Sequence, residues 1–306
     1  MAIHKGKNCG PTSKMSIKML SLQSKASHKP KTTYTMKKIN LALLALFVTV
    51  FATIACSKSE DEPQVPPQPE NPAVPTSSIE LRLLCYNVHK CVGLDDKYSP
   101  ERIAKIIKDN DVEAVALQEL DSVTMRLPVD VLGELAEQTG MYPTFGPAID
   151  FQGGKYGIGV LTKQKPISTR RVPLPCRSEP RLLLIVELQD YYFCSTHLSL
   201  HEADRITSMG IIISELSKLN KPVIIAGDFN DTRNSKAMKL LATEFYVFPK
   251  GGNANTFPAD KPNSEIDFMA LYTGKGAKAT VKNHTVLNCP VESDHRPIFA
   301  KVLVEW

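Results

Sequence analysis

Polar side chains that could carry out chemistry stand beside short apolar runs at six places in the chain. They are carboxylates, amides and imidazoles: Asn87, Gln118, Glu119, His197, Asp228, Asn230, Asp267, Asp294 and His295. A lone aspartate at the end of a strand is more often a turn residue or a helix cap than a catalyst. Six such places with the same residue types are hard to explain by independent coincidence, so one shared site is the better interpretation.

These residue types favour a hard metal ion and an activated water. Carboxylate and amide oxygens prefer Mg²⁺ or Mn²⁺ to Zn²⁺, and histidine with aspartate suits proton transfer. The chain has no GxSxG, GxxxxGKS/T or HExxH motif and no GxGxxG after a predicted strand. The usual signals of serine hydrolases, P-loop proteins, zinc proteases and dinucleotide-binding proteins are therefore missing. A hard cation with an activated water points instead to hydrolysis of phosphate esters.

Eight apolar runs predict the strands that must position these side chains. They cover residues 81–86, 112–117, 158–161, 182–188, 191–196, 223–226, 266–271 and 297–304. Gln189 and Asp190 join two of them as a hairpin, while helical patterns separate others. Because hairpins and βα alternation both occur, we expect mixed sheets, and strands near both ends of the domain suggest two stacked sheets covered by helices.

Two helices are predicted by their starts and by apolar periodicity. One begins at the N-cap and first-turn pair Ser99-Pro100, and the other covers residues 202–219, before Asn220-Lys221-Pro222. The residues expected to face the core are Ile103, Ile106, Ile107, Ile206, Met209, Ile213 and Leu216.

A set of motifs resembles one known superfamily. The segments LRLLCYNVH, ALQELD, YGIGVLT, STHLSLH, IIAGDFND, EIDFM and SDHRPI resemble the endonuclease/exonuclease/phosphatase superfamily, also called the DNase I-like fold. They occur in family order across residues 79–306, and GDFN with SDHRP is the most specific pair. The resemblance implies a four-layer α/β sandwich with two mixed β-sheets flanked by helices, and metal-dependent hydrolysis of phosphoesters.

The resemblance also implies a metal site and a phosphate contact. Glu119 would be the main ligand of Mg²⁺ or Mn²⁺, assisted by Asn87, and Asp294 would lie beside the metal. Tyr156 falls near a family position that contacts the substrate phosphate.

The catalytic roles implied by the resemblance fall on five residues. Asp228 would orient or deprotonate the attacking water, and Asn230 would hold the water or a phosphoryl oxygen. Asp267 would fix the imidazole of His295, which would stabilise the transition state or move a proton. His197 would contact the phosphate and is a candidate to protonate the leaving oxygen.

Other residues near these motifs have plainer interpretations. His89 and His201 are expected at the rim or surface, and Arg296 is expected to pack beneath the site, whereas a substrate contact by Arg181 stays open. The cysteines outside the leader show no CxxC or metal-type spacing, and two of them, Cys85 and Cys194, lie in apolar runs that predict burial. A single disulfide among these five cysteines also stays open.

The first part of the chain resembles an export signal. Met36-Lys37-Lys38, the apolar run after it and Thr53-Ile54-Ala55-Cys56 together resemble a bacterial lipoprotein signal, in which Cys56 would be the lipidated residue. Residues 1–55 are thus expected to be a leader, residues 56–78 a lipidated, proline-rich acidic linker, and residues 79–306 the catalytic domain. The expected location is a bacterial envelope membrane, either the outer membrane or the cell surface, and the alternative is an uncleaved signal anchor.

The charge of the exported part bears on the substrate. The 306-residue chain has a net charge of +5, but residues 1–55 hold nine lysines and no acidic residue, which leaves a net charge of −4 for the remaining 251 residues. This argues mildly against a nucleic-acid partner. We therefore expect a monomeric enzyme acting on a small or lipid-derived phosphate mono- or diester. The alternatives are an extracytoplasmic nuclease and, from another class, a catalytically inactive binding lipoprotein.

Overall fold

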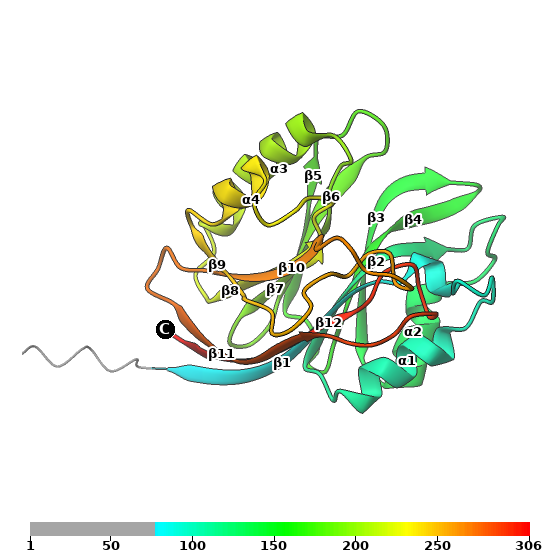
Figure 1. Cartoon of the computed structure of the whole chain (residues 1–306), viewed down its shortest axis with the longest axis horizontal. Helices are drawn as coiled ribbons and strands as arrows, with labels where there is room; N and C mark the ends of the chain where they lie inside the picture. Colours follow the sequence, from blue (N-terminus) through cyan, green and yellow to red (C-terminus); the bar gives the residue numbers. More distant parts are fainter. Residues whose placement is uncertain (1–76) are drawn as a thin grey trace, which may run out of the picture. The chain divides into compact units, whose positions relative to one another are not determined.

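The computed structural model describes residues 77–306, in which twelve strands form two six-stranded sheets (Figure 1). The first sheet has the order β11-β12-β1-β2-β4-β3. Its strands are β1 (Ser78–Asn87), β2 (Ala114–Ser122), β3 (Tyr142–Phe151), β4 (Gly154–Thr162), β11 (Lys278–Val286) and β12 (Ile298–Glu305). Only β1 and β2 are parallel in this sheet, so it is mixed, as predicted.

The second sheet has the order β5-β6-β7-β8-β10-β9. Its strands are β5 (Ser168–Leu174), β6 (Arg181–Glu187), β7 (Tyr192–His197), β8 (Val223–Asp228), β9 (Phe245–Val247) and β10 (Asp267–Tyr272). Strands β7 and β8 are parallel and the other neighbours are antiparallel. The predicted hairpin at Gln189 and Asp190 is confirmed, because it joins β6 to β7.

Four helices cover the outer faces of the two sheets. They are α1 (Pro100–Asp109), α2 (Val131–Thr139), α3 (Glu202–Leu216) and α4 (Lys236–Leu241), and a short 3-10 turn, η1 (His89–Cys91), follows β1. Helices α1 and α2 pack on the first sheet, and α3 and α4 pack on the second. The expected four-layer α/β sandwich is confirmed.

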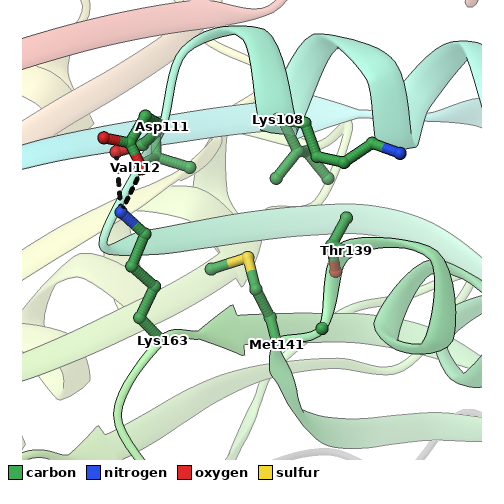
Figure 2. Close-up of a pocket in the computed structure, with 8 residues that line it drawn as sticks. Lys108, Asp111, Val112, Thr139, Met141 and Lys163 are labelled. Atoms are coloured by element: carbon green, nitrogen blue, oxygen red, sulfur yellow. Dashed lines mark hydrogen bonds and ion pairs between the residues drawn. The ribbon is translucent and has the colours of Figure 1, made fainter.

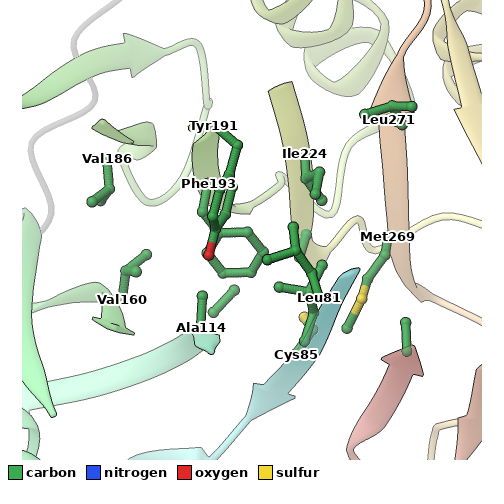
Figure 3. Packing of buried hydrophobic residues seen from close by; sticks show 14 of the residues in the cluster. Leu81, Cys85, Ala114, Val160, Val186, Tyr191, Phe193, Ile224, Met269 and Leu271 are labelled. Carbon is green, nitrogen blue, oxygen red and sulfur yellow. The ribbon is translucent and has the colours of Figure 1, made fainter. Parts of the chain in front are cut away.

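Apolar side chains from the inner faces of both sheets fill the space between them (Figure 3). Leu81 and Cys85 of β1, Phe193 of β7 and Met269 of β10 are all buried in this cluster. Burying one such side chain contributes about 1.5–3 kcal/mol relative to leaving it exposed. The cluster therefore fixes the spacing of the two sheets, on which the geometry of any site shared between them depends.

The helix predictions are confirmed with local corrections. Pro100 is the first residue of α1, but Ser99 makes no side-chain capping bond, because its hydroxyl donates to Glu101 Oε2 at 2.9 Å. Helix α3 ends at Leu216, three residues before the predicted end. Ile106, Ile206 and Ile213 are only partly buried, whereas the other predicted core residues of the two helices are fully buried.

Both ends of the described chain lie at the start of β1, away from its carboxyl end (Figure 1). Ser77 and Trp306 exchange two backbone hydrogen bonds, with N···O distances of 3.2 and 3.1 Å. The predicted leader, Cys56 and most of the linker lie outside the described residues. From Ser77 onward, no helix is long and apolar enough to cross a membrane. The five cysteines of this part of the chain are free thiols, and Cys85 and Cys194 are buried as predicted.

Candidate active site

The register of the second sheet places three of the predicted catalytic residues side by side. His197 is the last residue of β7 and pairs with Asp228, the last residue of β8, which pairs in turn with Asp267, the first residue of β10. Gly227 allows this close approach, because a Cβ atom there would lie 2.2 Å from the backbone oxygen of Thr196. The GD pair in the GDFN motif is thus explained by strand packing as well as by chemistry.

His295 and Asp267 form the predicted dyad. His295 Nδ1 lies 3.0 Å from Asp267 Oδ2, and the two side chains are almost completely buried. Burial opposes the charged imidazolium, but the carboxylates of Asp267 and Asp228 outweigh it and raise the pKa of His295 to about 10. The ring of Phe257 packs against the imidazole with centroids 4.9 Å apart. The histidine is therefore held in one orientation with a proton on each ring nitrogen.

Asp228 is the acceptor on which the polar groups of both sheets converge. Its Oδ2 lies 3.1 Å from Asn87 Nδ2, 3.4 Å from His197 Nε2 and 3.6 Å from His295 Nε2, and its Oδ1 accepts from the backbone N–H of Asn230 at 2.8 Å. Burial raises the pKa of this carboxyl to about 7, against the opposing effect of His295. A carboxylate with a pKa near neutrality is suited to accept a proton from water.

Glu119 is brought to the same place by an irregularity inside a strand. The pairing of β2 with β4 shifts between Leu117 and Leu120, and Glu119 has a φ of 60°. Such bulges turn a side chain away from its regular direction and are frequent next to active sites. The sequence pattern placed Glu119 after the end of a strand, and this was wrong, because β2 continues to Ser122.

An amide connects the two sheets at the site. Asn87 Nδ2 donates to Glu119 Oε1 at 3.0 Å as well as to Asp228, while Asn87 Oδ1 accepts from the backbone N–H of His89 at 3.2 Å. In this orientation Asn87 positions both carboxylates. Beneath it, Gln118 of the first sheet donates to the Ser195 hydroxyl of the second at 3.2 Å. A buried polar chain therefore fixes the register of one sheet against the other below the site.

This site can now be compared with known proteins. A family model described as the endonuclease/exonuclease/phosphatase family matches residues 84–295, which hold all the residues described above. The chain belongs to this family. Its members are hydrolases that act on phosphoesters, and they generally use divalent metal ions.

Several relatives and solved structures resemble the chain. The uncharacterized protein YbhP of Escherichia coli K12 is 23% identical over 256 residues, which cover 74% of this chain and 98% of YbhP. A family member from Bacteroides vulgatus has a TM-score of 0.60 at 19% identity, over 73% of this chain and 98% of that one. A mannosyl-6-phosphatase of Bacteroides thetaiotaomicron VPI-5482 has a TM-score of 0.59 at 16% identity, over 72% of this chain and 99% of that one. At these identities the two structures show a shared fold.

The acidic groups of this family member fit a divalent cation. Asp228 and Asp267 offer carboxylate oxygens within 4.8 Å of each other, and within the described residues Asp267 Oδ1 is buried without a hydrogen bond. His295 lies in the same cluster, but as an imidazolium it has no lone pair for a metal. The carboxylate of Glu119, bonded to Asn87, adds a further oxygen donor nearby. Asp294 is partly buried beside them, with its Oδ1 3.3 Å from the Ser293 hydroxyl. Oxygen donors of this kind suit Mg²⁺ or Mn²⁺, and the assignment of Glu119, Asn87 and Asp294 as the ligands stays a prediction.

The remaining predicted residues line the approach to Asp228. Asn230 has a φ of 48°, a conformation that asparagine tolerates, and its Nδ2 donates to the Leu198 carbonyl at 2.9 Å. His197 is buried, and burial together with Arg181 lowers its pKa well below the ordinary value, so its imidazole is neutral. Arg181, whose role the sequence left open, lies at the site: its Nη1 is 3.5 Å from His197 Nδ1 and pairs with Glu179.

A small cavity of about 110 Å³ adjoins Glu119, and we call it the Lys90 cavity. Its lining residues are His89, Lys90, Glu119, Arg126, Phe151, Tyr156 and Glu179. Tyr156 therefore lies near the site as predicted, and burial raises its pKa, which keeps the phenol a neutral donor. Sequence reasoning missed Arg126, Phe151 and Glu179, because they lie outside the family motifs and no spacing marks them.

A second cavity, of about 180 Å³, lies at the opposite end of β2 (Figure 2). Asp111 and Val112 line it just before β2 begins, whereas Glu119 lies near the end of that strand. One of its two lysines, Lys163, is paired with Asp111 (Figure 2). This cavity therefore contains none of the groups that converge on Asp228.

The plainer predictions for neighbouring residues are confirmed for the two histidines. His201 is exposed at the N-cap of α3, and His89 is partly buried at the rim of the Lys90 cavity. Arg296 has a structural role, because its Nε donates to the Ala259 carbonyl at 2.6 Å.

Proposed function

We propose that the domain hydrolyses phosphate mono- or diesters by in-line attack of water that Asp228 activates, with Mg²⁺ or Mn²⁺ as cofactor. The observation that carries the proposal is the convergence of Asn87, His197 and His295 on a single buried carboxylate, next to the acidic group of Glu119. A site with a proton acceptor, a fixed imidazolium and acidic metal ligands has the parts that phosphoester hydrolysis requires.

Each residue of this chain would have a distinct task. Asp228 takes a proton from the attacking water, and the backbone N–H of Asn230 fixes its second oxygen. His295, held as an imidazolium by Asp267, stabilises negative charge on the phosphoryl oxygens and can return a proton to the leaving oxygen. His197 is neutral, so we assign it a hydrogen bond to the phosphate rather than the role of acid. A divalent ion, when bound, supplies charge neutralisation and orientation of the phosphoryl group.

We further propose that the substrate is a small phosphoester. The net charge of −4 after the leader disfavours binding of a nucleic-acid backbone. The name of the mannosyl-6-phosphatase that shares the fold indicates that this scaffold accepts a sugar phosphate. A lipid-derived phosphoester has the same reacting group and belongs to the same proposal.

Purified residues 58–306 should hydrolyse at least one phosphoester in the presence of Mg²⁺ or Mn²⁺, and a chelator should abolish the reaction. The measurement is phosphate or product release from a panel of sugar phosphates, inositol phosphates, sphingomyelin, RNA, plasmid DNA and model mono- and diesters. Readdition of Mg²⁺ should restore the rate, and Glu119→Gln should raise the Mg²⁺ concentration needed for half-maximal rate. Cleavage of DNA alone would favour the nuclease, and no turnover of any substrate would favour a binding lipoprotein.

The chain is also proposed to be exported and lipidated at Cys56. The support is the lipoprotein-type signal that ends there and the proline-rich segment that follows. Expression of the whole chain in a bacterium fed radiolabelled palmitate should label the wild-type protein and leave Cys56→Ser unlabelled. Equal labelling of both proteins would contradict this proposal, and it would leave the proposed chemistry untouched.

A further inference from the structure

Among residues 77–306, no carboxylate directly contacts Lys90, the lysine that lines the Lys90 cavity. Glu119, Asp121 and Asp294 act on its charge only from farther away. Arg126 binds both oxygens of Asp121, with Nε···Oδ2 and Nη2···Oδ1 distances of 2.8 and 2.7 Å. Glu179 pairs with Arg181. Within residues 77–306, no carboxylate oxygen lies within 4 Å of Lys90 Nζ, which contacts His89 Nε2 at 2.8 Å. Glu119 is the remaining acidic group of the lining, and it would be occupied by the metal.

Lys90 lies where the lack of a directly paired carboxylate raises the free energy of its charged form. The side chain is partly buried, and burial with the nearby charge of Arg126 lowers its pKa. His89, Lys90 and Cys91 all have positive φ, at 44°, 52° and 59°. Non-glycine residues in this region carry strain, which persists when the surrounding structure imposes it and which clusters at functional sites. By contrast, Lys163 in the larger cavity already has its aspartate.

The size of the cavity limits what could enter it. Typical ligand pockets measure roughly 300–1,000 Å³, whereas about 110 Å³ has room for only a few water molecules. A nucleobase or a whole sugar ring would not fit, but one phosphate or carboxylate group would. Phe151 and Tyr156 form one wall, braced by the guanidinium of Arg126 at 4.6 and 5.4 Å from their ring centroids. The cavity is therefore a preformed subsite for one small group.

We propose that the Lys90 cavity binds a second anionic group, a phosphate or a carboxylate, that the substrate carries beside the phosphoester being hydrolysed. This inference rests on the proposed function, since the cavity adjoins Glu119 of the same site. Lys90 Nζ supplies the charge, and the neutral Tyr156 phenol supplies a donor. The substrate class is then narrowed to phosphoesters with a neighbouring negative charge.

The test compares substrates that carry one anionic group, the phosphoester alone, with substrates that carry two; we call them singly and doubly anionic by this count of groups. It uses three proteins: the wild type, Lys90→Gln and the control Lys97→Gln. Lys97 is exposed and its side chain makes no ion pair in the described part of the chain. The substrate pairs are inositol 4-phosphate with inositol 4,5-bisphosphate, and glycerol 3-phosphate with 3-phosphoglycerate. Lys90→Gln should raise KM for the doubly anionic member by about 10-fold or more, as loss of a charged hydrogen bond does, with kcat changed less than 2-fold. KM for the singly anionic member should stay within 2-fold.

Two results would overturn the inference. An equal rise in KM for both members of each pair would mean that Lys90 holds the phosphate being hydrolysed. Unchanged KM for every substrate would mean that Lys90 binds none of them. The unfolding midpoint and circular dichroism of each variant would show that the fold is kept.

A binding measurement separates this inference from the proposed chemistry. Isothermal titration calorimetry in Ca²⁺ buffer should give the wild type about 10-fold higher affinity for inositol 4,5-bisphosphate than for inositol 4-phosphate, and Lys90→Gln should lose the difference. If the affinities differ in this way but no substrate is hydrolysed in Mg²⁺ or Mn²⁺, the proposed hydrolase activity is refuted and the anion subsite is supported. If substrates are hydrolysed but the two affinities are equal, the hydrolase activity is supported and the anion subsite is refuted.

Discussion

Asp228→Asn should lower kcat by on the order of 10²-fold or more, one of the two largest effects expected of a single replacement. Loss of a general base typically costs this much, or roughly 2.7 kcal/mol of transition-state stabilisation. The four groups nearest the carboxylate oxygens are donors: Asn87 Nδ2, the backbone N–H of Asn230 and the Nε2 atoms of two histidines. An amide at this position both loses basicity and turns an NH₂ group toward a donor. Steady-state kinetics with any substrate found in the panel measures the effect.

The pH dependence gives an independent check on Asp228. Burial raises its pKa to about 7, and the base acts only when it is deprotonated. The wild-type rate should therefore fall as pH drops through the midpoint, about 10-fold per pH unit below it, and bound metal should move the midpoint below 7. Asp228→Asn should lack this acidic limb. The matched control is Asp190→Asn, in the turn at the far end of β7, and normal kcat in Asp228→Asn would refute the assignment.

His295→Ala should also lower kcat by on the order of 10²-fold or more, because it removes a positive charge held at the phosphate. Asp267→Asn should have a similar effect through the same imidazole, since it removes the carboxylate that raises the pKa of His295. The double variant should then be little worse than either single one, as is usual for residues that act as a unit. A double-mutant cycle on kcat/KM measures this.

His295 is buried, so His295→Ala could lower the stability of the fold as well as kcat, and it needs a control. His284 of β11 is equally buried but packs against Phe248 away from the dyad, with centroids 6.1 Å apart. His284→Ala should lower the unfolding midpoint and leave kcat within a few-fold. Fully additive effects of His295→Ala and Asp267→Asn would contradict the dyad, because independent residues would be acting.

The sequence predicted the inner strands of both sheets and missed the edge strands. The eight apolar runs correspond to β1, β2, β4, β6, β7, β8, β10 and β12, which all have neighbours on both sides. The missed strands, β3, β5, β9 and β11, are the four edges. Edge strands need less apolar surface and tolerate proline: β3 contains Pro143 and Pro147, and β5 contains Pro173 with mostly exposed neighbours. The sequence pattern of β3 and β5 is therefore that of a loop, whereas β9 has only three residues.

The site shows a similar division between what motifs reveal and what they do not. Asn87, His197, Asp228, Asp267 and His295 were found because each borders an apolar strand and belongs to a motif. Their common contact with Asp228, however, depends on the register of β7, β8 and β10, which sequence periodicity does not specify. The residues of the Lys90 cavity come from separate loops and strands. His89, Glu119 and Tyr156 of its lining lie within motifs. Lys90 comes directly after a motif, and no pattern in the sequence marks it.

The pairing of Ser77 with Trp306 places both ends of the domain on the side opposite the site. Strand β1 has ten residues at about 3.3 Å each, so roughly 30 Å separates the point where the chain enters from Asn87 at the site. Any segment that precedes Ser77 therefore joins the domain at the end of β1 that lies opposite the site. An attachment at this point does not itself cover the site. A tag or surface attached at either end of the domain should likewise leave the catalytic face free.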